Sequence, residues 1–168
     1  MRKVWAFLSG IACLLSFPSC TEVECPLDSV VVMTCGLYDA ESHDKLLLPQ
    51  TLSITPSGKD TLLLNSARDI QTFVLPLKMG ATCDTMLFHF SDNWERSATD
   101  TIYLHHENIP HFESVECPST IFHKLKAVTW GNDKTSELKT TIDSVAIVRE
   151  LVDYDDVENI QIYLHCDF

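Results

Sequence analysis

Histidine is the residue type in this chain best suited to acid–base catalysis or metal binding, because its imidazole ionises near neutral pH and ligates transition metals. The closest grouping is His105-His106-Glu107, followed by His111 and Glu113. Neighbouring residues of a strand point to opposite faces, so His105 and His106 are poorly placed to share one metal. We therefore expect solvated histidines on polar faces rather than a zinc or copper site. The seven histidines are His43, His89, His105, His106, His111, His123 and His165.

Other patterns that would carry catalysis are missing from the sequence. The acid-rich stretch 153–158 offers oxygen ligands of the kind that calcium prefers, but it lacks the turn glycine and the ligand order of an EF-hand loop. There is no G-x-S-x-G nucleophile motif and no phosphate-binding G-x-x-x-x-G-K-S/T loop. We therefore predict no catalytic residue, no metal and no cofactor, and we interpret stretch 153–158 as a solvated acidic loop.

The charge of the chain argues against a nucleic-acid partner. Asp and Glu number 24 against 12 Lys and Arg, which gives a formal net charge of -12. Nucleic-acid binding relies on clustered Lys and Arg that contact phosphates, whereas here the basic residues stand singly between acids. We interpret the acidity as a source of solubility.

The amino terminus has the pattern of an export signal. Arg2 and Lys3 form a short basic region, and residues 4–17 follow without any charge. Such a run is shorter than the roughly 20 apolar residues that a membrane-spanning helix needs. We expect residues 1–19 to be a signal peptide that is removed, which leaves 10 basic against 24 acidic residues.

Ser16-Phe17-Pro18-Ser19-Cys20 resembles a lipobox, in which a small residue precedes a cysteine that receives diacylglycerol before the leader is cut. Phe17 and Pro18 depart from the usual pattern. Cys13 also follows a small residue, but its use would leave an apolar region of only about eight residues. We predict lipid attachment at Cys20, a tether over residues 20–27 and stable membrane anchoring, because several acyl chains exceed the two-signal threshold.

Glu22 and Glu24 directly follow the predicted lipid site. Acidic residues at this place resemble the surface-export signal of lipoproteins in Bacteroidota-type bacteria. We expect a lipid-anchored protein of the outer membrane, and the periplasmic and cell-surface faces both stay open.

The cysteine content also points to an oxidising compartment. No C-x-x-C pair occurs, and this makes a disulfide a better expectation than a zinc or redox site. Val23-Glu24-Cys25-Pro26 recurs as Val115-Glu116-Cys117-Pro118, and we predict a Cys25–Cys117 disulfide. Cys35 and Cys83 are expected to be buried free thiols, and the state of Cys166 is left open.

Alternation of apolar and polar residues dominates the rest of the chain and predicts β-strands. Turn residues separate the runs, a local helix over 148–157 is an alternative, and 108–119 is expected to be a surface loop held by Cys117. We predict an all-β fold over residues 28–168, an antiparallel, immunoglobulin-like β-sandwich or a barrel of about seven to nine strands. The runs are 29–38, 46–54, 61–64, 70–77, 84–90, 101–105, 125–130, 141–148 and 160–164.

A tripeptide of Asp, then Ser or Thr, then an apolar residue occurs five times. Asp commonly ends a turn by a local hydrogen bond, so each copy is expected at the start of a strand. The triplet also resembles the O-glycosylation acceptor of Bacteroidota-type envelope proteins, in which the hydroxyl carries the glycan. The candidate acceptors are Ser29, Thr61, Thr85, Thr101 and Ser144.

Several of these segments, in this order, resemble a family of uncharacterised lipoproteins from Bacteroidota. The resemblance implies an envelope location and a single β-rich domain, and it implies no catalytic residue. It is carried by Cys20, Cys25-Pro26, Gly36-Leu37-Tyr38-Asp39, Phe73-Val74-Leu75-Pro76-Leu77, Asp100-Thr101-Ile102 and Val115-Glu116-Cys117.

Three functions are consistent with these features. The first is a non-enzymatic envelope module that binds a protein partner while anchored to the membrane by its lipid. The second is a β-sandwich that binds a glycan or small ligand, since Trp94, Trp130 and Tyr103 would stack on sugars if exposed. A metal-dependent or hydrolytic enzyme is the third hypothesis.

Overall fold

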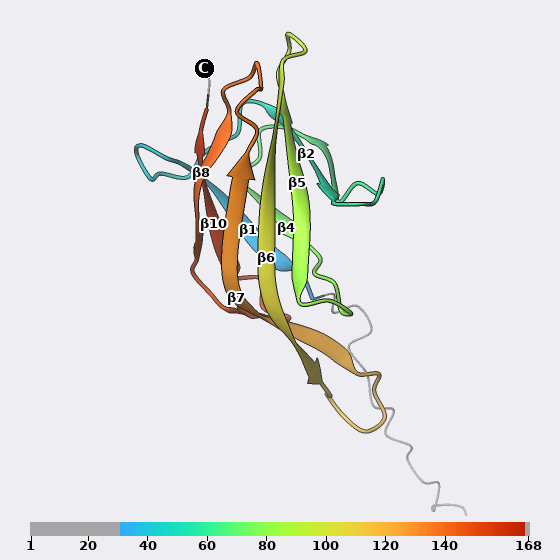
Figure 1. Ribbon diagram of the computed structural model, residues 1–168. Coiled ribbons are helices and arrows are strands. Elements are labelled where there is room, and N and C mark those ends of the chain that lie inside the picture. The colour runs from blue at the N-terminus through green and yellow to red at the C-terminus, as the bar shows by residue number, and fades with distance from the viewer. Residues whose placement is uncertain (1–30, 167–168) are drawn as a thin grey trace, which may run out of the picture.

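The computed structural model describes residues 31–166, in which every regular element is a β-strand (Figure 1). The predicted sites Cys20, Cys25 and Ser29 lie outside the described residues. The strands are β1 (Met33–Asp39), β2 (Thr51–Pro56), β3 (Leu64–Ala67), β4 (Thr72–Leu75), β5 (Cys83–Ser91), β6 (Ser97–His111), β7 (Thr120–Asn132), β8 (Thr141–Ile147), β9 (Leu151–Val152) and β10 (Glu158–His165).

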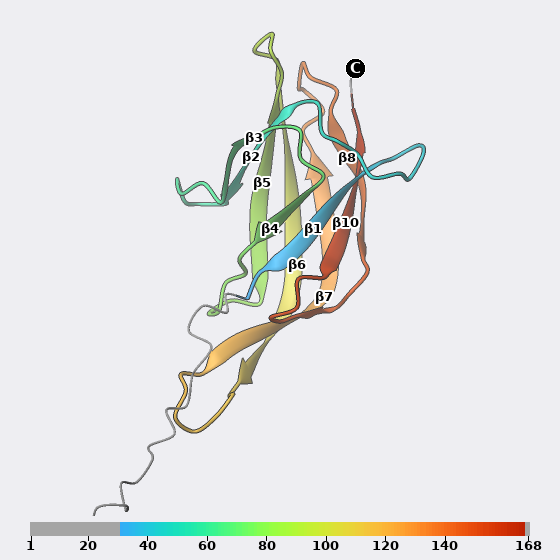
Figure 2. The same cartoon turned by 180° about the vertical axis from the view of Figure 1, so that it is seen from behind.

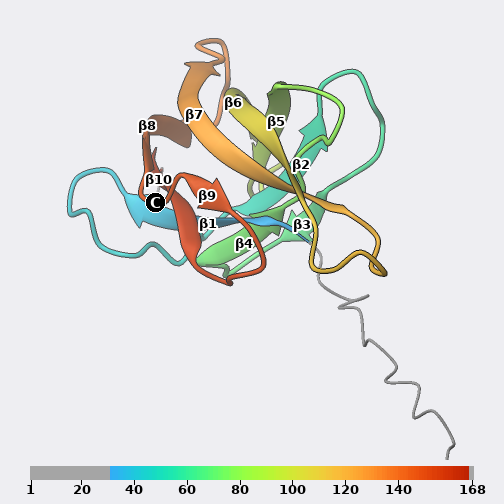
Figure 3. The ribbon, with the colours of Figure 1, turned by 90° about the horizontal axis from the view of Figure 1, so that it is seen from below.

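The strands form two sheets. One sheet has the order β4-β1-β10-β8 and the other has the order β3-β2-β5-β6-β7-β9. Neighbours within each sheet are antiparallel except β1 and β10, which run parallel. The two sheets lie across from each other in Figures 1 and 2, and Figure 3 shows the strands arranged around a common centre. The predicted all-β class is confirmed, with the two-residue β9 bringing the described strands to ten.

The core forms where alternating apolar side chains of the two sheets meet. Met86, Phe88 and Phe90 of β5 are each 1% exposed, as the period-two pattern predicted. Ile160, Ile162 and Leu164 of β10 are fully buried and belong to the same cluster. Full burial of each such side chain contributes about 1.5–3 kcal/mol relative to exposure.

The largest difference from the predicted boundaries concerns segment 108–119. β6 continues to His111 and β7 starts at Thr120, so only residues 112–119 form the connection. β5 starts at Cys83, opposite His105, so the part of β6 beyond His105 pairs only with β7. An edge position tolerates Pro110, which has no N–H to donate. The hairpin protrudes from the body of the molecule in Figures 1 and 3.

Three other expectations about local structure differ from the structure. Segment 46–50 is irregular and contains Pro49, although Leu46 and Leu48 are buried and bonded through their N–H groups to the carbonyls of Leu37 and Ile70. The strand expected at 61–64 is shifted along the chain: residues 61–63 are irregular, and β3 begins at Leu64. The helix considered for 148–157 is replaced by the short strand β9, which pairs with β7.

Asp100 and Asn132 connect the two sheets. The buried Asp100 carboxylate accepts a 2.6 Å hydrogen bond from the Ile142 N–H of β8, and the Asn132 side-chain amide donates to the Ile142 carbonyl at 2.9 Å. Burial raises the pKa of Asp100, although backbone hydrogen bonds from Ile142 and Asp133 lower it in part. One polar pair thus ties β6 and β7 to an edge of the opposite sheet.

Candidate functional site

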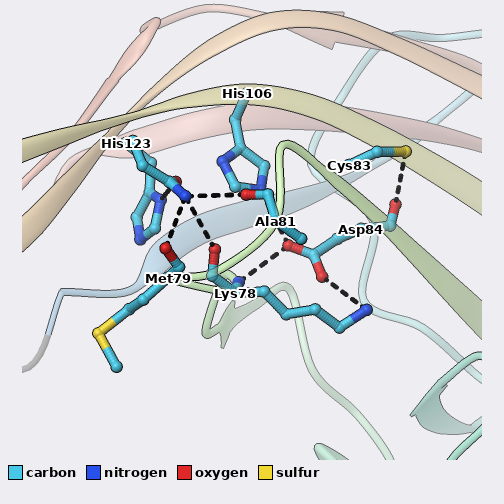
Figure 4. A network of polar contacts seen from close by, with 8 residues as sticks. Lys78, Met79, Ala81, Cys83, Asp84, His106 and His123 are labelled. Carbon is cyan, nitrogen blue, oxygen red and sulfur yellow. Dashed lines mark hydrogen bonds and ion pairs between the residues drawn. The ribbon is translucent and has the colours of Figure 1, made fainter.

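The most buried set of ionisable side chains lies at the start of β5. Asp84 is the second residue of β5, points toward the core and is 2% exposed. Its Oδ2 atom lies 3.0 Å from His106 Nε2 and accepts a 2.9 Å hydrogen bond from the Lys78 N–H. The Lys78 ammonium lies 3.2 Å from Oδ1 (Figure 4). The buried carboxylate is thereby paired with hydrogen-bond donors, as burial of a charge requires.

His106 and His123 bring β6 and β7 to the same place. The two rings are 3% and 2% exposed and meet edge to face with centroids 5.0 Å apart. His123 Nδ1 lies 2.7 Å from the Asn108 side-chain oxygen. The Asn108 amide in turn donates to the carbonyls of Met79 and Ala81, both at 2.8 Å. We therefore interpret these groups as a clamp that holds loop 78–82 against the end of the sandwich.

Burial determines the charge of His123. Desolvation, followed by the neighbouring His106, lowers the pKa of His123 to about 4, and Asp84 offsets this in part. The imidazole is therefore neutral at physiological pH. The expectation of solvated histidines was wrong for His106 and His123, because the apolar surroundings of a strand's inner face were not recognisable from single polar residues.

The predicted separation of His105 and His106 is confirmed, since His105 is exposed and His106 is buried. A β-bulge between these two residues shifts the register with β7. His111 lies apart from both, stacked on Phe122 at 4.2 Å and 3.0 Å from a Glu113 carboxylate oxygen. Within residues 31–166, no three His, Cys, Asp or Glu side chains are placed to hold one metal.

Arg149, four residues before Asp153, provides a counter-ion for the acidic stretch 153–158. Arg149 donates two 2.9 Å hydrogen bonds to the Asp153 carboxylate and a 2.8 Å bond to Asp155. A bidentate guanidinium–carboxylate pair of this kind fixes the geometry of both groups. The loop is therefore organised by an arginine, which the sequence interpretation did not include.

A second constellation surrounds a surface cavity of about 490 Å³ next to the turn between β5 and β6. Asp92 organises this turn, because its carboxylate accepts from the N–H groups of Trp94 and Arg96 at 2.8 and 3.0 Å. It also accepts a 2.6 Å bond from Arg96 Nε. Desolvation opposes ionisation of Asp92, but the hydrogen bonds from Arg96 and Trp94 outweigh it and lower the pKa. Arg68, Gln50 and Asn93 also line the cavity.

The aromatic residues proposed to stack on sugars are all accessible but do not form one surface. Trp94 is 77% exposed, Tyr103 40% and Trp130 37%. Trp94 lies in the β5–β6 turn, whereas Tyr103 is six residues along β6 from Ser97, roughly 20 Å at 3.3 Å per residue. Only Trp94 lines the cavity described above.

The Asp-Ser/Thr triplets are not uniformly at strand starts, which corrects the prediction. Asp100 is the fourth residue of β6, Asp143 the third of β8, and Thr61 lies in the loop before β3. Asp84 and Asp100 are buried acceptors of hydrogen bonds rather than turn residues. Because side chains alternate, the hydroxyl after an inward Asp faces outward. Thr61 is exposed, and the acceptors Thr85, Thr101 and Ser144 are half-buried.

The cysteines differ in burial. Cys35 is a buried free thiol as predicted, and burial raises its pKa. Cys83 is free but only half-buried, because the position opposite His105 faces away from the core. Cys166 is free, and burial raises its pKa to about 12. Cys117 lies in the connection 112–119, 3.3 Å from the Ser114 hydroxyl.

A polar cluster across β1 and β10 was not predicted from the sequence. The Tyr38 hydroxyl donates a 2.8 Å bond to Glu158, and Lys45 lies 3.3 Å from the same carboxylate. Gly36 makes room for this arrangement, since an added Cβ would collide with Glu158 and lie 2.8 Å from the Tyr38 ring. The one available signal was Gly36 inside an apolar strand run.

Fold and sites together define a class: an all-β domain of two sheets with a buried carboxylate–histidine clamp and a surface cavity beside the β5–β6 turn. A family of unknown function (DUF6452) matches residues 51–164, more than half of the chain, and the chain therefore belongs to this family. Comparison with curated proteins and with solved structures finds no match. Among residues 31–166, no helix is long and apolar enough to cross a bilayer.

Proposed function

We propose that this chain is a lipid-anchored protein of the bacterial outer membrane whose β domain is a non-enzymatic binding module for an envelope protein. The basic and apolar leader and the lipobox-like sequence before Cys20 support the anchor. The acidic residues behind Cys20 and the resemblance to Bacteroidota lipoproteins support the location.

The observation that carries the binding role is the protruding β6–β7 hairpin. Its connection presents Phe112, 68% exposed, and Val115, fully exposed. Exposed apolar side chains at a protruding tip are typical of contact with another protein. The base of the hairpin is stiffened by His111, Phe122 and Tyr154, whose rings stack or meet edge to face.

The anchor is tested by the intact mass of the protein purified from its own membranes. We expect the mass of a chain beginning at Cys20 plus its acyl groups, together with any glycan. Cys20→Ser should yield an unlipidated chain, and Cys13→Ser should leave the lipid in place. A native chain that begins at Met1 without lipid would refute the anchor and the location.

Protein binding is tested by a photo-crosslinking amino acid at position 112 in intact envelopes. A discrete crosslinked species should form from position 112 and not from position 62, where Leu62 is exposed in another loop. Phe112→Ser with a crosslinker at position 115 should reduce the same species. Equal labelling from both sites would indicate nonspecific contact and contradict the proposal.

Two covalent features belong to this proposal. A Cys25–Cys117 disulfide would join the tether to the hairpin. Cys35, Cys83 and Cys166 are free thiols, so none of them competes for this pairing. O-glycosylation is proposed at Ser29, Thr61, Thr85, Thr101 and Ser144, with the exposed Thr61 the most accessible of the described acceptors. Peptide mass mapping without reductant tests both features.

Glycan binding is the second candidate function. The observation that favours it is the exposure of Trp94 at the edge of a cavity that holds two arginines, Arg68 and Arg96. An exposed indole face and directional polar groups are the two elements of sugar recognition.

A further inference from the structure

Arg68 pairs with no carboxylate among residues 31–166, although the chain is acidic overall. Most cations of the described residues form ion pairs, among them Lys45, Lys78 and Arg149. No ion pair between described residues includes Arg68, whose Nη2 atom donates to the neutral Asn93 side chain at 2.6 Å. A guanidinium has five N–H donors, so most of them are left for a ligand. The side chain lines the 490 Å³ cavity rather than a flat surface.

The backbone around the cavity adopts a conformation that L-residues disfavour. Ser66 and Asp69, on either side of Arg68, have φ angles of 47° and 52°, and Glu95 between Trp94 and Arg96 has a φ of 62°. The left-handed region costs roughly 1–2 kcal/mol for a residue with a Cβ. Of the four non-glycine residues with positive φ among residues 31–166, three lie within two residues of a lining residue in the sequence. Such strain concentrates at ligand sites.

Hydrogen bonds hold these strained segments in place. The Ser66 N–H donates to the Ser53 hydroxyl at 3.0 Å, and the Asp69 N–H donates to the Leu48 carbonyl at 3.2 Å. On the other wall, the Asp92 carboxylate fixes the turn that carries Trp94. Both walls are therefore built before a ligand arrives, which reduces the entropy lost on binding.

We infer that this cavity binds a glycan that carries a carboxylate, with the carboxylate on Arg68 and a sugar ring against Trp94. A guanidinium pairs with a carboxylate through two parallel hydrogen bonds. The indole is 77% exposed and offers the flat apolar surface on which the C–H face of a pyranose packs. Gln50 and Asn93 line the same cavity and bear amides that suit hydroxyl groups.

The size and charge of the site favour this ligand over a bare anion or a protein. A cavity of about 490 Å³ falls in the range that holds a small organic ligand, and it is larger than phosphate requires. The charge of Arg96 is already balanced by Asp92. Arg68 therefore provides one positive charge in the cavity, which one carboxylate of the ligand would balance. The inference names the ligand of the second candidate function and rests on that proposal.

Fluorescence of Trp94 provides a direct test. The chain has three tryptophans, and Trp5 lies in the leader that we propose is removed, so mature protein with Trp130→Phe reports on Trp94 alone. We expect a saturable signal with tetra-galacturonate and at least about tenfold weaker binding of the neutral tetra-galactose. Arg68→Gln should weaken tetra-galacturonate binding about tenfold or more, the value of a charge-assisted hydrogen bond. The matched control Lys134→Gln removes a loop cation elsewhere and should change nothing.

Three outcomes would overturn the inference: no saturable signal, equal affinity for both sugars, or an unchanged affinity in Arg68→Gln. Inorganic phosphate that displaces tetra-galacturonate at equal concentration would identify an anion site without sugar recognition, which also refutes it. Calorimetry on the unaltered chain gives the same comparison if the Phe variant does not fold. Failure here leaves the lipid anchor and the crosslink from position 112 unaffected, so the proposals fail separately.

Discussion

At the scale of single residues, burial rather than residue type decides what the ionisable groups do. Asp84 and Asp100 belong to the same Asp-Ser/Thr pattern as the exposed Asp143, but the first two accept hydrogen bonds inside the protein. An unpaired carboxylate in that position would lose several kcal/mol of hydration. Each buried acid therefore requires a partner from another strand or loop.

The low pKa of His123 predicts loss of stability in acid. Its pKa falls from 6.5 to about 4 on folding, so the folded state disfavours the proton. The contribution of neutral His123 to the free energy of unfolding is complete above pH 6.5. It is lost as the pH falls toward 4, and the loss reaches about 3 kcal/mol. Urea unfolding of His123→Gln should show a weaker fall in stability over this range. Asn65→Ala, which removes an exposed amide and no ionisable group, should keep the wild-type slope.

Gly36 provides a steric prediction. Gly36→Ala must displace the Glu158 carboxylate from Tyr38 and should lower the free energy of unfolding by about 1–3 kcal/mol. Gly80→Ala is the matched control, since nothing lies near its added Cβ, and should change stability by less than about 0.5 kcal/mol. Equal stability of the two variants in thermal unfolding would contradict this role for Gly36.

At the scale of elements, the clamp couples loop 78–82 to the β6–β7 hairpin. The Asn108 side chain makes three of these contacts, with His123 and with the carbonyls of Met79 and Ala81. The His106 N–H adds a 2.9 Å backbone bond to Thr82. The loop is therefore held by the strand that also leads into the exposed tip.

Removal of the Asn108 amide should release the loop. In Asn108→Ala we expect faster hydrogen exchange at residues 79–82 and a loss of about 1–3 kcal/mol, because a buried imidazole and two carbonyls lose a partner. Asn65→Ala removes an exposed amide on β3 and serves as the control. Unchanged exchange at residues 79–82 would show that the loop is held by other contacts.

At the scale of the whole molecule, the two described surfaces of interest lie at opposite ends. The β5–β6 turn with Trp94 is at the top in Figure 1, and the β6–β7 connection with Phe112 is at the bottom. β6 runs between them over 15 residues. A sandwich of this form would hold the proposed glycan site and the proposed protein contact apart.

The proposed Cys25–Cys117 bridge gives a prediction for global stability. Without reductant, Cys117→Ser should lower the free energy of unfolding by about 2–4 kcal/mol, since the unfolded chain regains the entropy of a long loop. With reductant, the variant and the wild type should agree. Cys83→Ser, at a half-buried free thiol, controls for loss of a sulfur. A difference that persists in reductant would argue for local packing instead.

Period-two alternation was enough to predict the all-β class and the inward faces of β5 and β10, because side-chain direction in a strand follows from the backbone alone. The alternation did not predict where strands end or which strands pair. Pro110 suggested a loop, but pairing with β7 keeps that segment extended. The opposite directions of His105 and His106 followed from the same alternation.

The clamp and the cavity could not be predicted from the sequence, because each joins residues that are far apart in the chain. Asp84, His106 and His123 meet only after β5, β6 and β7 pair in one register, and Arg68 reaches Asn93 only when β3 and the β5–β6 turn lie side by side. Local patterns determine which way a side chain points. Only tertiary pairing decides which side chain it meets there, and whether water is excluded from the contact.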